Sequence, residues 1–170
     1  MVKILMIIAM VCCMLFVSCE PKKQAPPYKL EQKEPKASIS IPYEEVGGVK
    51  TIPVKLNGVT MSMSYDTGAS GIHLSLNEVQ TLFKNGKIDK SDILGVGTAR
   101  IADGSVMENA TINIREIEIG GKEGLVLRDV QASVALNLDA PILLGNSVLD
   151  EFASIEIDNV GKTINFIKNQ

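Results

Sequence analysis

The chain has few of the residues on which many kinds of active site depend. Its 170 residues include three cysteines, one histidine and no tryptophan, and aromatic residues make up only 4%. The cysteines are Cys12, Cys13 and Cys19, so everything after residue 19 lacks a thiol. For that part of the chain, this excludes a disulfide, a catalytic cysteine, a cysteine-ligated metal and a pair of histidine ligands. We therefore expect no metal and no cofactor.

Excess positive charge is also missing. The formal net charge is −3, from 17 basic and 20 acidic residues, and no basic run occurs after residue 37. A nucleic-acid surface is therefore not expected. The single histidine, His73, lies beside an apolar run, where we interpret it as a partly exposed filler and not as a catalyst. With so few aromatic residues, Ile, Val, Leu and Met must fill the core.

The first 19 residues have the pattern of an export signal. Lys3 precedes a continuous apolar stretch over residues 4–17, which is too short to span a bilayer comfortably. The end of this stretch, Ser18-Cys19, resembles the lipobox of bacterial lipoproteins, in which the cysteine is acylated and becomes the new N-terminus. The resemblance implies lipidation at Cys19 and a lipid-anchored protein of the bacterial cell envelope, facing the periplasm or the surface. Ordinary secretion with cleavage near this point is the alternative.

Residues 20–37 are rich in proline and lysine and have almost no apolar side chains. A segment of this composition cannot bury enough surface to fold, so it predicts a disordered, extended tether. The folded domain is expected over residues 38–170.

Alternating apolar and polar residues predict strands along most of residues 38–170. Asn57-Gly58 and Asp103-Gly104 each lie between two strand-like runs and are typical of tight hairpins. Ser75, with Glu78 three residues later, is a capping box that predicts a short helix. Many short strands and little helix indicate an all-β, barrel-like domain with one or two short helices.

Two irregularities are expected in the second half of the domain. The apolar alternation changes phase between Ile114 and Ile117, which predicts a bulge near Arg115. Further along, Arg128-Asp129 separates two apolar runs, so two short strands are expected over residues 125–127 and 130–134.

The domain is organised around one stretch. An apolar-alternating strand over Val59–Tyr65 leads directly into Asp66, Thr67 and Gly68. Gly68 lets the backbone turn where a side chain would clash, and Thr67 offers a hydroxyl to a neighbouring backbone group. The pattern predicts a carboxylate held in a tight loop between two strands. Taken alone it is also compatible with an ordinary turn.

Residues 65–70 resemble the active-site loop of aspartic proteases, and Ala69 after the glycine is more like the retroviral, or retropepsin, branch. The resemblance extends over residues 51–152. It implies that Asp66 is catalytic and that Thr67, Gly68, Ala69 and Ser70 support it. A second matching run implies a strand that buttresses the loop, formed by Ile142, Leu143, Leu144 and Gly145, with a short helix over residues 146–152. The resemblance also implies that the Asp103-Gly104 hairpin is a flap, formed by Ile101, Ala102, Asp103, Gly104 and Ser105.

Peptide hydrolysis by this chemistry needs two carboxylates around one water molecule. The chain has a single Asp-Thr-Gly, so the resemblance implies a homodimer in which Asp66 meets its own copy across a two-fold axis. The C-terminal run over residues 163–167 is a candidate contributor to the dimer contact.

Three interpretations remain open from the sequence. The first is a tethered homodimeric aspartic endopeptidase, a hydrolase that acts on peptides or unfolded proteins. The second is a catalytically silent retropepsin-like lipoprotein that binds peptides. The third is an unrelated all-β module in which residues 66–68 form a turn, because a fold does not determine a function.

Overall fold

The computed structural model describes residues 37–100, 103–121 and 124–169. The predicted signal peptide and almost all of the tether lie outside the described residues, as do Ile101 and Ala102 of the expected flap. No helix in the described part is both long and apolar enough to cross a membrane.

Strands dominate the described chain, which confirms the predicted all-β class. In order, the elements are β1 (Ser38–Pro42), β2 (Glu44–Val46), β3 (Val49–Leu56), β4 (Val59–Tyr65), β5 (Ile72–Ser75), helix α2 (Leu76–Lys84), the 3-10 helix η2 (Lys90–Asp92), β6 (Ile93–Arg100), β7 (Val106–Ile119), β8 (Leu125–Ala135), β9 (Leu143–Leu144), helix α3 (Asn146–Leu149), β10 (Phe152–Asp158) and β11 (Thr163–Lys168).

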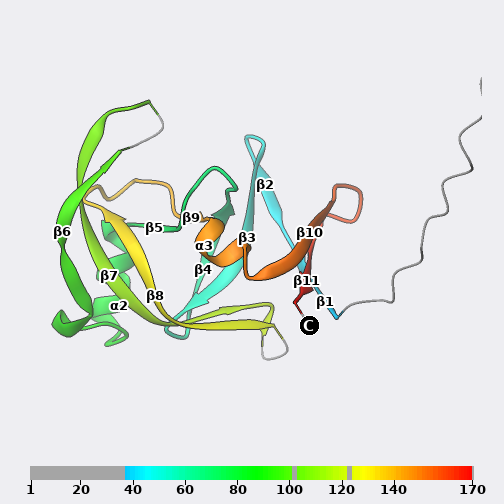
Figure 1. The fold of residues 1–170 in the computed structure, drawn as a ribbon, viewed down its shortest axis with the longest axis horizontal. Helices are drawn as coiled ribbons and strands as arrows, with labels where there is room; N and C mark the ends of the chain where they lie inside the picture. The colour runs from blue at the N-terminus through cyan, green and yellow to red at the C-terminus, as the bar shows by residue number, and fades with distance from the viewer. Residues whose placement is uncertain (1–36, 101–102, 122–123, 170) are drawn as a thin grey trace, which may run out of the picture. The chain divides into compact units, whose positions relative to one another are not determined.

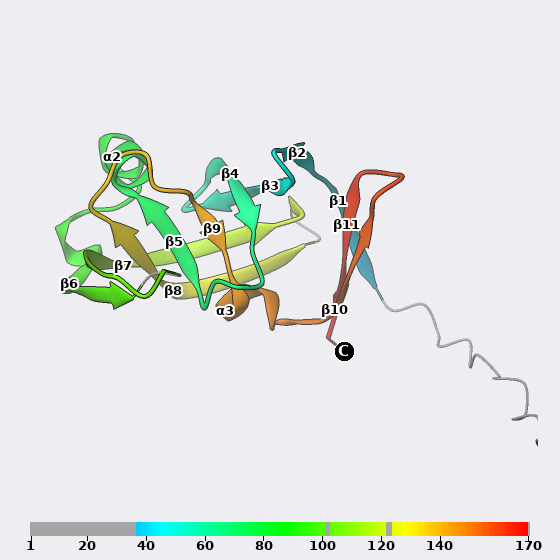
Figure 2. The same cartoon turned by 90° about the horizontal axis from the view of Figure 1, so that it is seen from above.

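The strands form two sheets (Figures 1 and 2). The larger has the order β2-β3-β4-β9-β5-β8-β7-β6, and an additional pairing of β3 with β7 closes its central strands into a barrel. The smaller has the order β1-β11-β10, and Figure 2 shows these three strands side by side at one end of the barrel. The C-terminal strand β11 is therefore flanked on both sides. A contribution of β11 to the predicted dimer contact would therefore come from its side chains and not from its edge, because β1 and β10 are the outer strands of this sheet.

Local sequence signals determine several connections. Asn57 and Gly58 form the turn from β3 to β4, with φ angles of 48° and 83°. The predicted capping box is complete, because the Ser75 side chain accepts a hydrogen bond at the start of α2 and the Glu78 side chain bonds back to the Ser75 backbone. These motifs satisfy backbone groups within a few residues, so the local sequence is enough to predict them.

Two local expectations were wrong. β8 runs without a break from Leu125 to Ala135, although Asp129 within it has a φ of 54°. Ile114 pairs with Val130 and Glu116 with Arg128, so the register of β7 on β8 is the same on either side of Arg115. Arg115 and Asp129, which lie between these pairs, are not themselves paired. The alternation of apolar residues therefore changes where both strands are irregular at the same place, and neither strand carries an extra residue.

The core is aliphatic, as the composition required. Ile52, Met63, Ile72, Leu74 and Leu144 are among the fully buried side chains of the barrel. The smaller sheet contains an aromatic contact, with the rings of Phe152 and Phe166 4.7 Å apart. The helix predicted over residues 146–152 is shorter than expected. α3 ends at Leu149, and Phe152 already belongs to β10.

Candidate active site

Asp66 follows the last residue of β4, at the point where the strand passes into the loop that leads to β5. Its backbone N–H donates to the carbonyl oxygen of Leu144 at 3.2 Å, which ties this position to β9. Its carboxylate oxygen Oδ1 accepts a hydrogen bond from the Gly68 N–H at 2.8 Å, and its carbonyl oxygen accepts one from the Ala69 N–H at 3.3 Å. The loop therefore orients a half-buried carboxylate through backbone contacts alone.

The segment at residues 142–145 lies directly against this loop. β9 pairs with β4 in parallel, with Leu143 opposite Ser64 and Leu144 opposite Tyr65. The Ser64 N–H donates to the Ile142 carbonyl at 2.9 Å. Beyond Gly145 the contact continues, since the N–H groups of residues 146 and 147 donate to the carbonyls of Ala69 and Ser70 at 2.9 and 3.0 Å. The two sequence runs that stood far apart in the chain are thus one structural unit.

Gly145 allows this close approach. A Cβ at this position would lie 2.5 Å from the carbonyl oxygens of both Ala69 and Gly71, distances that real Cβ atoms essentially never show. Asn146 adds a contact that the sequence pattern did not identify, because its side-chain Nδ2 donates to the Thr67 carbonyl at 3.1 Å. Of the other expected supports, Thr67, Gly68 and Ser70 are exposed, whereas Ala69 is buried.

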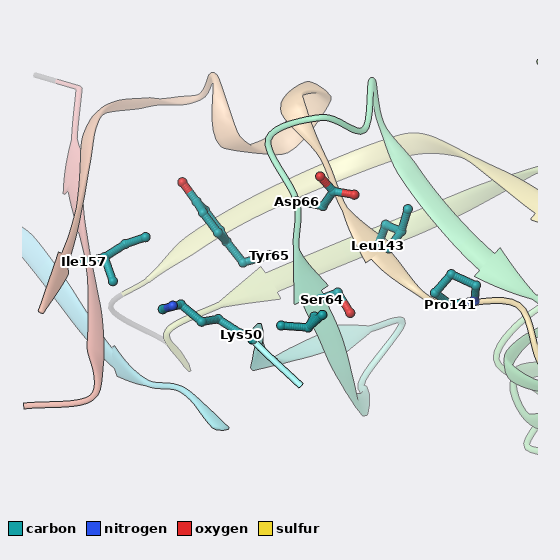
Figure 3. A pocket seen from close by; sticks show the side chains of 9 residues that line it. Lys50, Ser64, Tyr65, Asp66, Pro141, Leu143 and Ile157 are labelled. Carbon is teal, nitrogen blue, oxygen red and sulfur yellow. The ribbon is translucent and has the colours of Figure 1, made fainter. Parts of the chain in front are cut away.

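Asp66 opens onto a cavity of about 580 Å³. Figure 3 shows the Asp66 carboxylate beside Leu143, with Tyr65 and Lys50 on the side toward Ile157. The lining consists of Gly48, Val49, Lys50, Ser64, Tyr65, Asp66, Pro141, Leu143 and Ile157. Lys50 and Ile157 were not expected here. Lys50 comes from β3 and Ile157 from β10, and only tertiary structure brings these strands to the cavity.

Among the described residues that line the cavity, Asp66 is the one carboxylate and Lys50 the one cation, and the remaining lining residues are uncharged. Burial raises the pKa of the Tyr65 hydroxyl, so Tyr65 is neutral at physiological pH. Lys50 is drawn toward Glu45, with Nζ 3.5 Å from Oε1, and lies 5.3 Å from the ring centre of Tyr43. Among the described residues, no group of three or more His, Cys, Asp or Glu side chains could hold a metal ion.

His73 is closer to this site than its sequence context suggested. It lies on β5 opposite Leu143 of the cavity wall. Burial lowers the pKa of the imidazole, and the negative charge of Asp66 partly opposes that shift. Near pH 7 the imidazole is therefore neutral. The interpretation of His73 as a mere filler rested on its neighbours in the sequence, which do not include the residues of β9.

The expected flap is a hairpin between β6 and β7. Gly104 has a φ of 87° and Arg100 Nη1 donates to its carbonyl at 3.0 Å, while the Ser105 N–H donates to Asp103 Oδ1 at 2.8 Å. Asp103, Gly104 and Ser105 are all exposed, and they do not belong to the cavity lining. The hairpin is therefore present where it was expected, and its described turn is not part of the cavity wall.

Comparisons with known proteins agree with this geometry. Residues 52–151 match the model of a family described as gag-polyprotein putative aspartyl protease. Among solved structures, a retropepsin-like aspartic protease from Rickettsia conorii matches with a TM-score of 0.55 and 22% sequence identity, over 79% of this chain and 92% of that chain. This likeness confirms the expected retropepsin-like barrel. A comparison with curated protein sequences finds no significant match.

A substitution at Gly145 tests the contact between β9 and the Asp66 loop. Gly145→Ala places a methyl group against two carbonyl oxygens, so we expect the free energy of unfolding in urea to fall by about 2 kcal/mol or more. Gly95→Ala is the matched control, because a Cβ at Gly95 would meet nothing within 4 Å. That control should change stability by less than about 1 kcal/mol. Equal stability of the two variants would contradict the conclusion that the close contact at Gly145 excludes a side chain.

Proposed function

The chain belongs to the gag-polyprotein putative aspartyl protease family, and on this premise we propose that it is an aspartic endopeptidase that works as a homodimer. The observation that carries the proposal is the position of Asp66. Its half-buried carboxylate faces a cavity, and the Gly68 N–H and the β9 crossing hold it in place. An ordinary surface turn would need neither the cavity nor the crossing.

The chemistry follows from two carboxylates at short range. Two such groups cannot both ionise, so the pair shares one proton. The ionised member takes a proton from a water molecule, and the resulting hydroxyl oxygen attacks the peptide carbonyl carbon. The protonated member donates a hydrogen bond to the carbonyl oxygen and stabilises the negative charge that develops there. In this proposal Asp66 of each chain supplies one carboxylate, while residues 67–70 and 142–145 hold it in position.

In this proposal the second carboxylate comes from another chain. No other aspartate after residue 66 is followed by Thr-Gly or Ser-Gly, and among the described residues Asp66 is the one carboxylate in the cavity lining. Exposed apolar residues border the cavity, with Val49 48% and Ile157 40% exposed. A second copy that brings its own Asp66 to this cavity would cover them. Ile157 lies on β10, which is an outer strand of the smaller sheet in the described part of the chain. The edge of β10 is therefore also available to the partner.

One alternative function follows from the same observation. A single chain has only half of the catalytic pair, so without dimerisation it would bind peptides in the cavity and not cleave them. This is the peptide-binding lipoprotein that the sequence left open. Turnover of a peptide substrate distinguishes the two functions.

We further propose that the domain is anchored to the cell envelope by a lipid on Cys19. The supporting observations are the apolar stretch over residues 4–17, the small Ser18 before Cys19 and the proline-rich segment over residues 20–37. A lipid anchor would confine the chains to one surface and raise their effective concentration, which favours dimerisation.

Replacement of Asp66 tests the chemistry. Asp66→Asn keeps the size of the side chain and an oxygen that can accept the Gly68 N–H, but it cannot share a proton. Cleavage of a casein-derived peptide by the full-length protein in detergent should fall by about 100-fold or more, with the melting temperature unchanged or higher. Asp150→Asn, at an exposed site after α3, is the control and should retain activity. Near wild-type turnover by Asp66→Asn would place the chemistry elsewhere.

Dilution tests the dimer. If activity requires two chains, the specific activity in detergent should rise with protein concentration at fixed substrate. Addition of excess Asp66→Asn chains should lower it, because each mixed pair retains one competent carboxylate. Light scattering on the same samples gives the mass. Constant specific activity over a range in which the mass is that of one chain would rule out the dimer.

Lipidation is tested by Cys19→Ala. The substitution removes the acyl acceptor, so the protein should leave the membrane fraction or accumulate unprocessed, and incorporation of a labelled fatty acid should be lost. Cys13→Ala is the matched control and should be processed normally. An unlabelled wild-type protein that stays in the membrane fraction would contradict the lipid anchor.

A further inference from the structure

A row of three side chains, one apolar and two polar, crosses the sheet beside the Asp66 cavity. His73 on β5 lies opposite Leu143 on β9 and opposite Ser133 on β8. Its neighbours along the strand, Ile72 and Leu74, are fully buried in the core. Because successive side chains of a strand point to opposite faces, His73 points away from the core. Residues opposite one another on adjacent strands share a face, so Leu143, His73 and Ser133 form one row.

Two independent observations connect this row to the cavity. Leu143 lines the cavity together with Asp66, so His73 is one strand further along the same face. The negative charge of Asp66 also acts on the imidazole of His73 and opposes the lowering of its pKa by burial. A peptide bound along the sheet face, with its scissile bond at Asp66, would therefore pass His73 with one of the neighbouring side chains.

The surroundings of His73 on the side away from Leu143 can form hydrogen bonds. Ser133 Oγ accepts a hydrogen bond from Asn109 Nδ2 at 2.6 Å. Thr111 lies opposite Ser133 on the next strand, β7. His73, Ser133, Asn109 and Thr111 are all partly buried. This end of the row is polar, in contrast to Pro141 and Leu143 in the cavity wall.

We propose that His73 is a specificity-determining residue that, with Ser133, forms a polar subsite for a glutamate or glutamine side chain of the substrate. The proposal rests on the function proposed above and adds the class of substrate. A half-buried imidazole beside a hydroxyl offers hydrogen bonds to a carboxylate or amide. A branched aliphatic side chain at the same place would leave these groups without partners, which disfavours it.

The charge of the imidazole gives the subsite a pH dependence. The residues paired with His73 are Leu143 from β9 and Ser133 from β8, and neither is ionisable. The ionisable group whose charge acts on His73 is the Asp66 carboxylate in the loop after β4. Because burial lowers its pKa, His73 is neutral near pH 7 and becomes cationic only in acid. At pH values between the pKa of a substrate glutamate, about 4.3, and the pKa of His73, the cationic imidazole would face the ionised carboxylate of the substrate. Glutamate should then gain over glutamine as the pH falls.

The experiment compares matched peptides. A peptide library randomised on both sides of the cleaved bond first locates the position at which His73→Val changes the preference. Peptides with Glu, Gln or Val at that position are then cleaved by the full-length protein in detergent, and kcat/KM is measured for each. The wild type should favour Gln over Val by about fivefold, the effect of one net hydrogen bond. His73→Val should abolish or reverse this preference.

Two further variants make the comparison specific. Gln131→Val is the matched control, because Gln131 is two residues from Ser133 on the same face of β8 and pairs with Asn113, further from Leu143. It should leave the Gln-to-Val ratio unchanged. His73→Gln keeps a hydrogen-bonding side chain if the valine variant folds poorly, and it cannot become cationic. The Glu-to-Gln ratio should therefore rise more steeply toward acid pH in the wild type than in His73→Gln. Charged groups other than His73 are the same in both proteins, so the difference between the two pH profiles is the effect of the imidazole.

Binding separates this proposal from the proposed function. Fluorescent forms of the same peptides are titrated against Asp66→Asn protein with and without His73→Val. Absence of cleavage together with binding that discriminates Gln from Val through His73 would refute the protease and support the subsite. Cleavage with the same ratios in wild type, His73→Val and His73→Gln would refute the subsite and leave the protease standing. Absence of any peptide binding would refute both.

Discussion

The site depends on one close contact between two backbone segments. Gly145 brings the β9 segment against the Asp66 loop at a distance that excludes a side chain. The hydrogen bonds on either side of it connect Asp66 to Leu144 and Ala69 to Asn146. Backbone hydrogen bonds in such a crossing have few alternative partners, so the loop has little freedom to rearrange. The position of the carboxylate is therefore a consequence of barrel assembly and not of the loop alone.

The same arrangement is the basis of the proposed homodimer. The barrel delivers one carboxylate to the cavity, and the smaller sheet contributes Ile157 to its wall while leaving the edge of β10 free. A single chain thus combines an accurately held Asp66 with exposed apolar surface around it. A second copy would supply the missing carboxylate and cover that surface in one step. Catalysis and association would then depend on the same few residues.

The proposed specificity, in contrast, depends on the register between strands. His73 faces the cavity side because Ile72 and Leu74 occupy the core, and it meets Ser133 because β5 and β8 are aligned at that residue. A shift of one residue on β5 would bury the imidazole and expose an aliphatic side chain. The pairing of β5 with β9 places it beside Leu143 and within reach of the charge of Asp66. The proposed polar subsite therefore requires three strands in the correct alignment.

The sequence by itself determined features that are closed within a few residues. These are the Asn57-Gly58 turn, the capping box of α2 and the Asp66-Thr67-Gly68 loop, and it also indicated the Gly145 run through its resemblance to a family. Only the tertiary structure decided that β8 continues past Asp129, that β11 lies between β1 and β10, and that Lys50, His73 and Ile157 approach Asp66. The physical reason is the range of the interactions. Turns and caps satisfy neighbouring backbone groups, whereas strand order and register follow from burial of side chains that are far apart in the chain.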